Sequence, residues 1–177
     1  MKFDAALGIT FSGRLLHVGC GGSPCPEFLQ DCEEVRLDVV DDYKPHIVAN
    51  LLDMGDIGEY DIVYSSHVLE HVNQYQVQTA LKEFHRVLKP GGFALMFVPN
   101  LDGVSPTEEV LYDSPAGPIT GLDMFYGKKS LIEKMPYMAH HTGFVPATLK
   151  QSILDAGFSI GETSAMCGYN LLGIGIK

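Results

Sequence analysis

Short apolar runs, separated by polar and glycine-rich segments, dominate the first hundred residues of the chain. They are Arg14 to Val18, Val35 to Val39, Ile47 to Leu52, Tyr60 to Ser65 and Phe93 to Val98. Runs that are apolar on both faces and bounded by turn signals are typical of strands in a parallel sheet that is covered on both sides. We therefore predict five parallel strands.

One longer segment between the fourth and fifth runs repeats with a helical period. Its apolar positions are Val77, Ala80, Leu81, Phe84, Val87 and Leu88, and Pro90-Gly91-Gly92 follows as a stop signal. Strands that alternate with helical or turn segments form βαβ units, and such units build a doubly wound α/β fold.

The last third of the chain has a different pattern. Residues 100–142 are rich in Pro, Gly and Asp, so we predict an irregular insertion with one short helix at most. A helix then begins near Pro146 and ends at Gly157. The final runs, 158–166 and 170–176, are too close together for a crossover helix and must pair antiparallel. The whole pattern predicts a seven-stranded, mostly parallel sheet with an antiparallel C-terminal hairpin.

Composition narrows the possible functions. A chain of 177 residues with 46% hydrophobic content fits one domain, residues 1–177. A net charge of -10 argues against a nucleic-acid partner, because phosphate binding needs clustered Lys and Arg. No apolar run has the length of a signal peptide or a membrane span, so we expect a cytoplasmic protein without a membrane partner.

The four cysteines are Cys20, Cys25, Cys32 and Cys167, and none forms a C-x-x-C pair. We expect reduced thiols. A zinc site built from the first three is the alternative.

A glycine cluster follows the first predicted strand. Gly19, Gly21 and Gly22 would let a ligand approach the main chain closely, and the start of a following helix would offer unpaired N–H groups. Pro24 occupies the third glycine position of the dinucleotide pattern G-x-G-x-x-G, which weakens a phosphate-binding interpretation. The cluster predicts a cofactor cradle, with a glycine-rich turn that binds nothing as the alternative.

Five stretches in order resemble the class I S-adenosylmethionine-dependent methyltransferases, particularly small ones similar to quinone-biosynthesis methyltransferases. They are LLHVGCGG, VRLDVVD, IVANLLDM, YDIVYSSHVLEHV and LKEFHRVLKPGGFALMFVPN, and they cover roughly residues 14 to 100. The resemblance implies a Rossmann-like methyltransferase fold, S-adenosylmethionine as cofactor and S-adenosylhomocysteine as product. It also implies in-line methyl transfer to a small-molecule acceptor.

The resemblance assigns cofactor contacts to individual residues. Asp38, 19 residues after Gly19, would accept both ribose hydroxyls. Asn50 and Leu51 match the position that meets the adenine, and Asp53 competes for that edge.

Two further positions concern the methionine part of the cofactor. Ser65 and Ser66 match residues whose backbone lies beside it, and His17 stands where the family usually has Asp or Glu to help hold the ammonium group. We expect carbonyls of Gly19 and Ser65 to replace that contact. A neutral His17 could also accept a hydrogen bond, and a structural histidine whose hydrogen bonds are satisfied within the protein is an equal alternative. The predicted cofactor-binding set is His17, Gly19, Cys20, Gly21, Asp38, Asn50, Leu51, Ser65 and Ser66.

Histidines supply the candidates for catalysis. A sulfonium is an activated leaving group, so alignment and exclusion of water contribute most, and a general base helps when the acceptor carries a proton. The candidate bases are His67, His140 and His141. His67 to His71 also matches the H-x-x-E-H signature of zinc peptidases. It follows a predicted buried strand, however, and falls inside the methyltransferase-like stretch, so we predict no metal.

The insertion is expected to form the acceptor-side wall, because loops beyond the carboxyl ends of strands surround the ligand crevice. Its large side chains form either an apolar lid or a small core of their own; they are Met124, Phe125, Tyr126, Met135, Tyr137 and Met138. A metal held by His140 and His141 with Asp102 or Asp123 is a minor alternative.

The segment before the first strand is short, so an open pocket or one completed in a homodimer is expected. Two other function classes remain: a non-catalytic S-adenosylmethionine-binding protein of the same fold that acts as a partner or regulator, and an NAD-linked oxidoreductase.

Overall fold

The computed structural model describes residues 11–177, in which seven strands form one sheet of order β3-β2-β1-β4-β5-β9-β8. The first five strands are parallel, and β9 runs antiparallel to both β5 and β8. This confirms the predicted fold class. The strands are β1 (Arg14–Val18), β2 (Glu33–Asp38), β3 (Ile47–Val48), β4 (Tyr60–Ser66), β5 (Leu88–Pro99), β8 (Ile160–Met166) and β9 (Asn170–Ile176).

The third strand is much shorter than the prediction of Ile47 to Leu52. The chain turns at Asn50 and does not continue as a strand. The side-chain Oδ1 of Asn50 accepts a hydrogen bond from the amide of Leu52 at 2.9 Å. Its main-chain carbonyl also accepts from the amide of Asp53 at 3.0 Å. Such local side-chain bonding competes with a strand ladder and turns the chain.

The predicted central helix is α1 (Val77–Arg86), and it ends before the Pro-Gly-Gly stop signal. The strand β5 already begins at Leu88, which pairs with Tyr60 of β4, and the register shifts before Phe93 pairs with Ile62. The stop signal therefore lies in an irregular part of β5.

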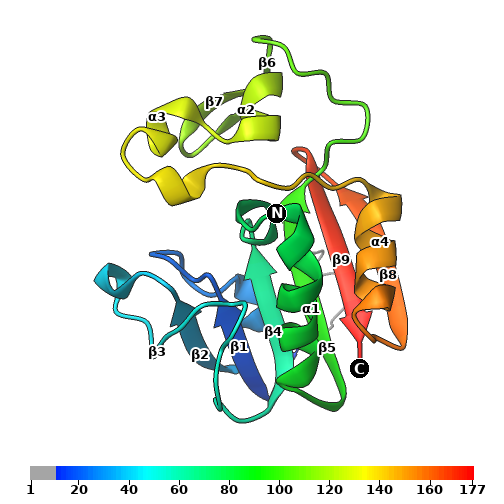
Figure 1. Ribbon diagram of the computed structural model, residues 1–177. Coiled ribbons are helices and arrows are strands. Elements are labelled where there is room, and N and C mark those ends of the chain that lie inside the picture. Colours follow the sequence, from blue (N-terminus) through cyan, green and yellow to red (C-terminus); the bar gives the residue numbers. More distant parts are fainter. Residues whose placement is uncertain (1–10) are drawn as a thin grey trace.

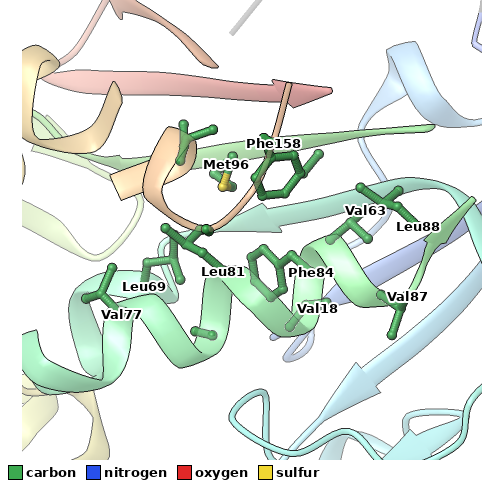
Figure 2. Packing of buried hydrophobic residues seen from close by; sticks show 14 of the residues in the cluster. Val18, Val63, Leu69, Val77, Leu81, Phe84, Val87, Leu88, Met96 and Phe158 are labelled. Atoms are coloured by element: carbon green, nitrogen blue, oxygen red, sulfur yellow. The ribbon is translucent and has the colours of Figure 1, made fainter. Parts of the chain in front are cut away.

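Both long helices cover the same face of the sheet (Figure 1). Phe84 and Leu81 of α1 pack toward Val63 of β4 and Met96 of β5 (Figure 2). The second long helix, α4 (Pro146–Asp155), adds Leu149 and Ile153 to the same cluster, and Ala156 and Phe158 join it from the segment that follows the helix.

The opposite face of the sheet is covered differently, because no α-helix within residues 11–177 packs on it. Leu15, Ile62 and Leu95 of the sheet pack there against Leu29 of a 3₁₀ helix, η2 (Glu27–Leu29). The helix expected directly after the glycine cluster does not form, since Pro24 and Pro26 remove amide donors and push the preceding residues away from helical backbone angles. A second 3₁₀ helix, η3 (Asp41–Tyr43), follows β2.

The insertion is more ordered than predicted and forms a lobe beyond the end of the sheet toward which β4 points (Figure 1). Its elements are β6 (Val110–Ser114), β7 (Gly117–Thr120), α2 (Gly121–Tyr126), α3 (Lys129–Ile132) and η6 (Pro136–Met138). Thr120 and Asp123 cap α2 reciprocally: each side chain accepts a hydrogen bond from the other's main-chain amide, at 3.1 and 2.9 Å.

Within residues 11–177, no helix has both the length and the apolar character needed to cross a membrane. The predictions for residues 1–10, on a leader and on a cap before the first strand, lie outside the described residues.

Candidate functional site

A cavity of about 550 Å³ opens at the carboxyl ends of β1, β2 and β4. The strand order reverses between β1 and β4, and this switch point is where open α/β sheets bind ligands. The volume lies within the usual range for small-molecule sites. The lining side chains and backbone come from Val18, Gly19, Cys20, Gly21, Ser23, Leu37, Asp38, Val39, Val40, Tyr43, Ala49, Asn50, Leu51, Leu52, Ser66, His67, Val68, His71, Val72, Gln76, Met135, Tyr137 and Met138.

Two glycines of the loop serve different purposes. Gly19 has φ of 65°, and a Cβ atom on it would collide with the side chain of Val68. Gly21 has φ of 45°, and a Cβ atom on it would meet no heavy atom within 4 Å. Gly19 thus allows close packing, whereas Gly21 leaves open space beside the cavity for a ligand.

Asp38 joins the end of β2 to the glycine loop. Its Oδ2 accepts a hydrogen bond from the amide of Gly21 at 2.7 Å, and its Oδ1 accepts from the amide of Val40 at 2.9 Å. The residue is 7% exposed and lines the cavity. Because a carboxylate has about four lone-pair positions, each oxygen can accept another hydrogen bond from a ligand hydroxyl.

Arg36 holds the same loop from the other side. Its guanidinium donates hydrogen bonds to the carbonyls of Gly21 at 2.8 Å and Ser23 at 2.9 Å. A guanidinium group carries five N–H donors in a rigid planar arrangement, so one arginine side chain can bind two carbonyls of the same loop. Sequence reasoning did not identify Arg36, because nothing local shows that its side chain reaches back to the loop.

Asn50 and Leu51 line the cavity, where the adenine edge is expected, and Asp53 does not.

Cys20 also lines the cavity, and burial raises the pKa of the Cys20 thiol. A protonated, buried thiol forms part of an apolar wall. Ser66 lines the cavity, whereas Ser65 is buried, and its Oγ has no hydrogen-bond partner within residues 11–177.

His17 lies outside the cavity lining and has contacts of its own. Its Nδ1 lies 2.7 Å from Oε1 of Glu34, and its ring packs edge-on against Tyr64 at a centroid distance of 5.0 Å. Burial lowers the pKa of His17 despite the opposing effect of Glu34. A neutral ring that donates from Nδ1 to the Glu34 carboxylate fits this site, so the geometry favours the structural alternative for His17 over a place beside a ligand.

Of the three predicted bases, only His67 lines the cavity. Its Nδ1 lies 3.2 Å from Oε1 of Glu70, and its Nε2 lies 2.9 Å from Oδ1 of Asn170. Burial alone would lower the pKa of His67, but the hydrogen bonds to Glu70 and Asn170 and the Glu70 charge raise it. Both ring nitrogens therefore already face oxygen atoms within hydrogen-bond distance.

His140 and His141 diverge, as adjacent residues in an extended segment do. The His140 ring lies against His71, with centroids 5.2 Å apart, and His141 is exposed. The amide of His141 donates to the carbonyl of Glu70 at 2.7 Å. The alternative metal site with Asp102 or Asp123 is wrong, because His140 gathers with Glu70 and His71.

The peptidase interpretation of residues 67–71 is also wrong. His67 has φ of 55°, and only residues 69–71 form a 3₁₀ helix, η4 (Leu69–His71). A zinc peptidase requires the pattern on a helix. A second 3₁₀ helix, η5 (Gln74–Gln76), leads into α1.

The alternative zinc site of three cysteines is not supported either. Cys25 and Cys32 pack with the apolar cluster on the opposite face, while Cys20 lines the cavity.

The large side chains of the insertion divide between the cavity and the interior of the lobe. Met135, Tyr137 and Met138 line the cavity, whereas Met124 is buried inside the lobe. Tyr126 is exposed. The part of the insertion around η6 thus lies beside the cavity, and its role as a lid stays a prediction.

Sequence reasoning missed several lining residues, above all Tyr43, His71 and Gln76. The H-x-x-E-H pattern did draw attention to His71. Nothing in the local pattern distinguishes Tyr43 or Gln76 from ordinary surface residues.

The cavity fits a nucleoside that carries an amino-acid chain. Asp38 offers acceptor positions for hydroxyls, and Asn50 offers a side-chain amide. The open side of Gly21 lets a ligand come into close contact with the main chain. Leu37, Leu51 and Val68 supply apolar surface for a base.

Comparisons with known proteins agree with this fold. The family model described as a methyltransferase domain matches residues 16–96. An S-adenosylmethionine-dependent methyltransferase from Mesorhizobium loti superposes with a TM-score of 0.66 at 16% identity, over 94% of this chain and 91% of that one. A search of curated proteins finds no match.

Two further similar structures come from Burkholderia thailandensis. An O-methyltransferase family protein has a TM-score of 0.61 at 16% identity, and it is matched over 93% of this chain but 51% of its own length. The present chain thus spans about half of that protein. The second is a 1,6-didemethyltoxoflavin-N1-methyltransferase, solved with 1,6-didemethyltoxoflavin and S-adenosylhomocysteine. It superposes with a TM-score of 0.60 at 14% identity, and the match covers 98% of this chain and 73% of that one.

Proposed function

We infer that this chain is an S-adenosylmethionine-dependent methyltransferase that acts on a small-molecule acceptor. The observation that carries the inference is the cavity at the β1–β4 switch point, where the open side of Gly21 meets the Asp38 carboxylate. The match of residues 16–96 to a methyltransferase-domain model supports it.

Each part of the cofactor has residues suited to it. Asp38 accepts hydrogen bonds from the ribose hydroxyls, and Asn50 and Leu51 contact the adenine. The main chain from Gly19 to Gly21, with Ser66 across the switch point, lies beside the methionine part. His17 makes no cofactor contact in this proposal, because it packs against Glu34 and Tyr64.

The cofactor supplies a methyl group on a positively charged sulfur, which leaves readily as a neutral thioether. The chain's own part is to hold the acceptor in line with that bond and to exclude water. Met135, Tyr137 and Met138 cover the acceptor side with apolar and aromatic surface.

Proton removal is not assigned to His67 in this proposal, because both of its ring nitrogens are engaged. Acceptors that lose their proton easily, such as acidic hydroxyls, need no strong base. The solved relatives include an O-methyltransferase family protein and an N-methyltransferase, so the methylated atom follows from the acceptor pocket and not from the fold. The quinone-biosynthesis-like subtype and a homodimer stay predictions.

Calorimetry tests cofactor binding first. The purified chain should bind S-adenosylhomocysteine and S-adenosylmethionine with one site per chain. Absence of heat, together with an unchanged melting temperature at millimolar ligand, would overturn the proposal. Transfer of a labelled methyl group to pooled phenols, quinols and amines then identifies the acceptor class.

The second candidate is a non-catalytic protein that binds the same cofactor. The lack of a free ring nitrogen on His67 favours it, since that is the one predicted base that lines the cavity. Tight cofactor binding without labelled product across the acceptor pools would select this candidate.

A further inference from the structure

Three side chains outside the cofactor-binding set converge beside the cavity. Glu70, His71 and His140 each offer one ligating atom, and these atoms lie within 4.8 Å of one another. Ligands around a tetrahedral ion at about 2.1 Å lie roughly 3.4 Å apart, so shifts on the order of 1 Å would close the site. We propose that Glu70, His71 and His140 bind a divalent first-row transition metal ion of the zinc type.

The two imidazoles are oriented as metal ligands are. Nδ1 of His71 lies 3.1 Å from the carbonyl oxygen of Ala139, and Nδ1 of His140 lies 2.9 Å from that of Met124. A carbonyl can only accept, so both Nδ1 atoms carry the proton and donate. Nε2 of each ring keeps its lone pair, and a donating partner on the other nitrogen is the usual second contact of a metal-bound histidine.

Glu70 supplies the negative charge and an atom that needs a partner. The residue is 1% exposed, and its Oε2 has no hydrogen-bond partner within residues 11–177. The other oxygen, Oε1, is held by His67 at 3.2 Å, which fixes the carboxylate plane. A buried carboxylate oxygen without a partner is costly, and a cation between the two rings would satisfy it.

The main chain keeps the two ligand-bearing segments together without a metal. The carbonyl of Glu70 accepts hydrogen bonds from the amides of His141 at 2.7 Å and Thr142 at 3.1 Å. The Thr142 hydroxyl donates to the carbonyl of Val72 at 2.7 Å. The site is therefore largely formed before a cation arrives, and side-chain rotation alone completes it.

Two imidazoles and one carboxylate form a ligand set that suits Zn²⁺ and other first-row divalent ions and leaves at least one coordination position open. His71 lines the cavity, so an open position there would be available to an oxygen of the acceptor. This last step rests on the proposed function, whereas metal binding itself does not.

Metal titration of the chelator-treated chain, with any affinity tag removed, tests the proposal. Co²⁺ is followed by its visible absorption, and Zn²⁺ by elemental analysis after gel filtration. We expect one equivalent per chain, at least about tenfold weaker binding in His71→Ala and His140→Ala, and a similar loss in Glu70→Gln. His141→Ala is the matched control, because this neighbouring histidine is exposed and should leave the affinity unchanged.

The proposal is overturned if the wild-type chain retains no metal, or if His71→Ala and His140→Ala bind as tightly as the His141→Ala control. Two histidine variants on separate segments keep the test valid if Glu70→Gln does not fold. Calorimetry with S-adenosylhomocysteine on the metal-free chain reports separately on the proposed function, so the two failures are distinguishable.

Discussion

The main-chain amide of Gly21 donates a 2.7 Å hydrogen bond to Oδ2 of Asp38, which joins the loop after β1 to the end of β2. We expect Asp38→Ala to weaken S-adenosylhomocysteine binding by about 1.5 to 3 kcal/mol, or roughly 10- to 150-fold, as for hydrogen bonds to a charged group. Calorimetry measures the change. Asp53→Ala is the control, since Asp53 is exposed and does not line the cavity. Equal affinity in the two variants would remove Asp38 from the ligand site.

The two loop glycines should respond differently to an added methyl group. Gly19→Ala should lower the unfolding free energy by about 2 to 5 kcal/mol. The alanine would have to adopt a left-handed backbone conformation, and its Cβ would collide with Val68. Gly21→Ala carries only the backbone penalty, about 1 to 2 kcal/mol, yet its methyl group enters the cavity and should weaken cofactor binding. Urea unfolding and calorimetry separate the effects. A Gly21→Ala variant that binds the cofactor normally would show that the open space is not used.

Stability should depend on pH through His17. Its pKa is lowered in the folded chain because burial outweighs the effect of Glu34, with Arg36 adding to the lowering and Asp38 opposing it. Between the folded pKa and the unfolded value near 6.5, the unfolded chain binds more protons. The contribution of His17 is therefore full above about pH 7 and decreases as the pH falls through 6.5. Below the folded pKa it changes no further.

The measurement is the urea-unfolding free energy of the wild type and of His17→Gln from pH 5 to pH 8. The difference between the two should grow as the pH rises and level off near neutrality. A difference that is constant, or largest at low pH, would contradict a neutral buried His17.

The apolar cluster between α1 and the sheet depends on Phe84, which is fully buried (Figure 2). Phe84→Ala should lower the unfolding free energy by about 3 to 5 kcal/mol, because it removes buried apolar surface and leaves a cavity. Tyr75→Ala serves as the control, since Tyr75 is 79% exposed and its loss should change stability by less than about 0.5 kcal/mol. Similar losses in both variants would mean that burial does not decide this part of the fold.

Much of the fold could be predicted from the chain because its signals are local. The apolar runs and the short connection before β9 predicted a mostly parallel sheet with an antiparallel end. Errors occurred where nearby chemistry competes with the pattern. The prolines after the glycine cluster prevent a helix there, and the Asn50 side chain ends β3 early.

The residues of the candidate site also fall into two groups, those that the sequence predicted and those that only the folded chain placed. The sequence by itself determined the glycine loop and the carboxylate at the end of the next strand, because parallel neighbouring strands bring their carboxyl ends to one edge wherever the rest of the chain goes. Only the tertiary structure decided that His17 turns to Glu34 and away from the cavity, and that His140 meets Glu70 and His71. Those contacts depend on which face a side chain takes and on how a distant segment returns to the sheet. Both are set by packing and hydrogen bonds between residues far apart in the chain, which no local pattern records.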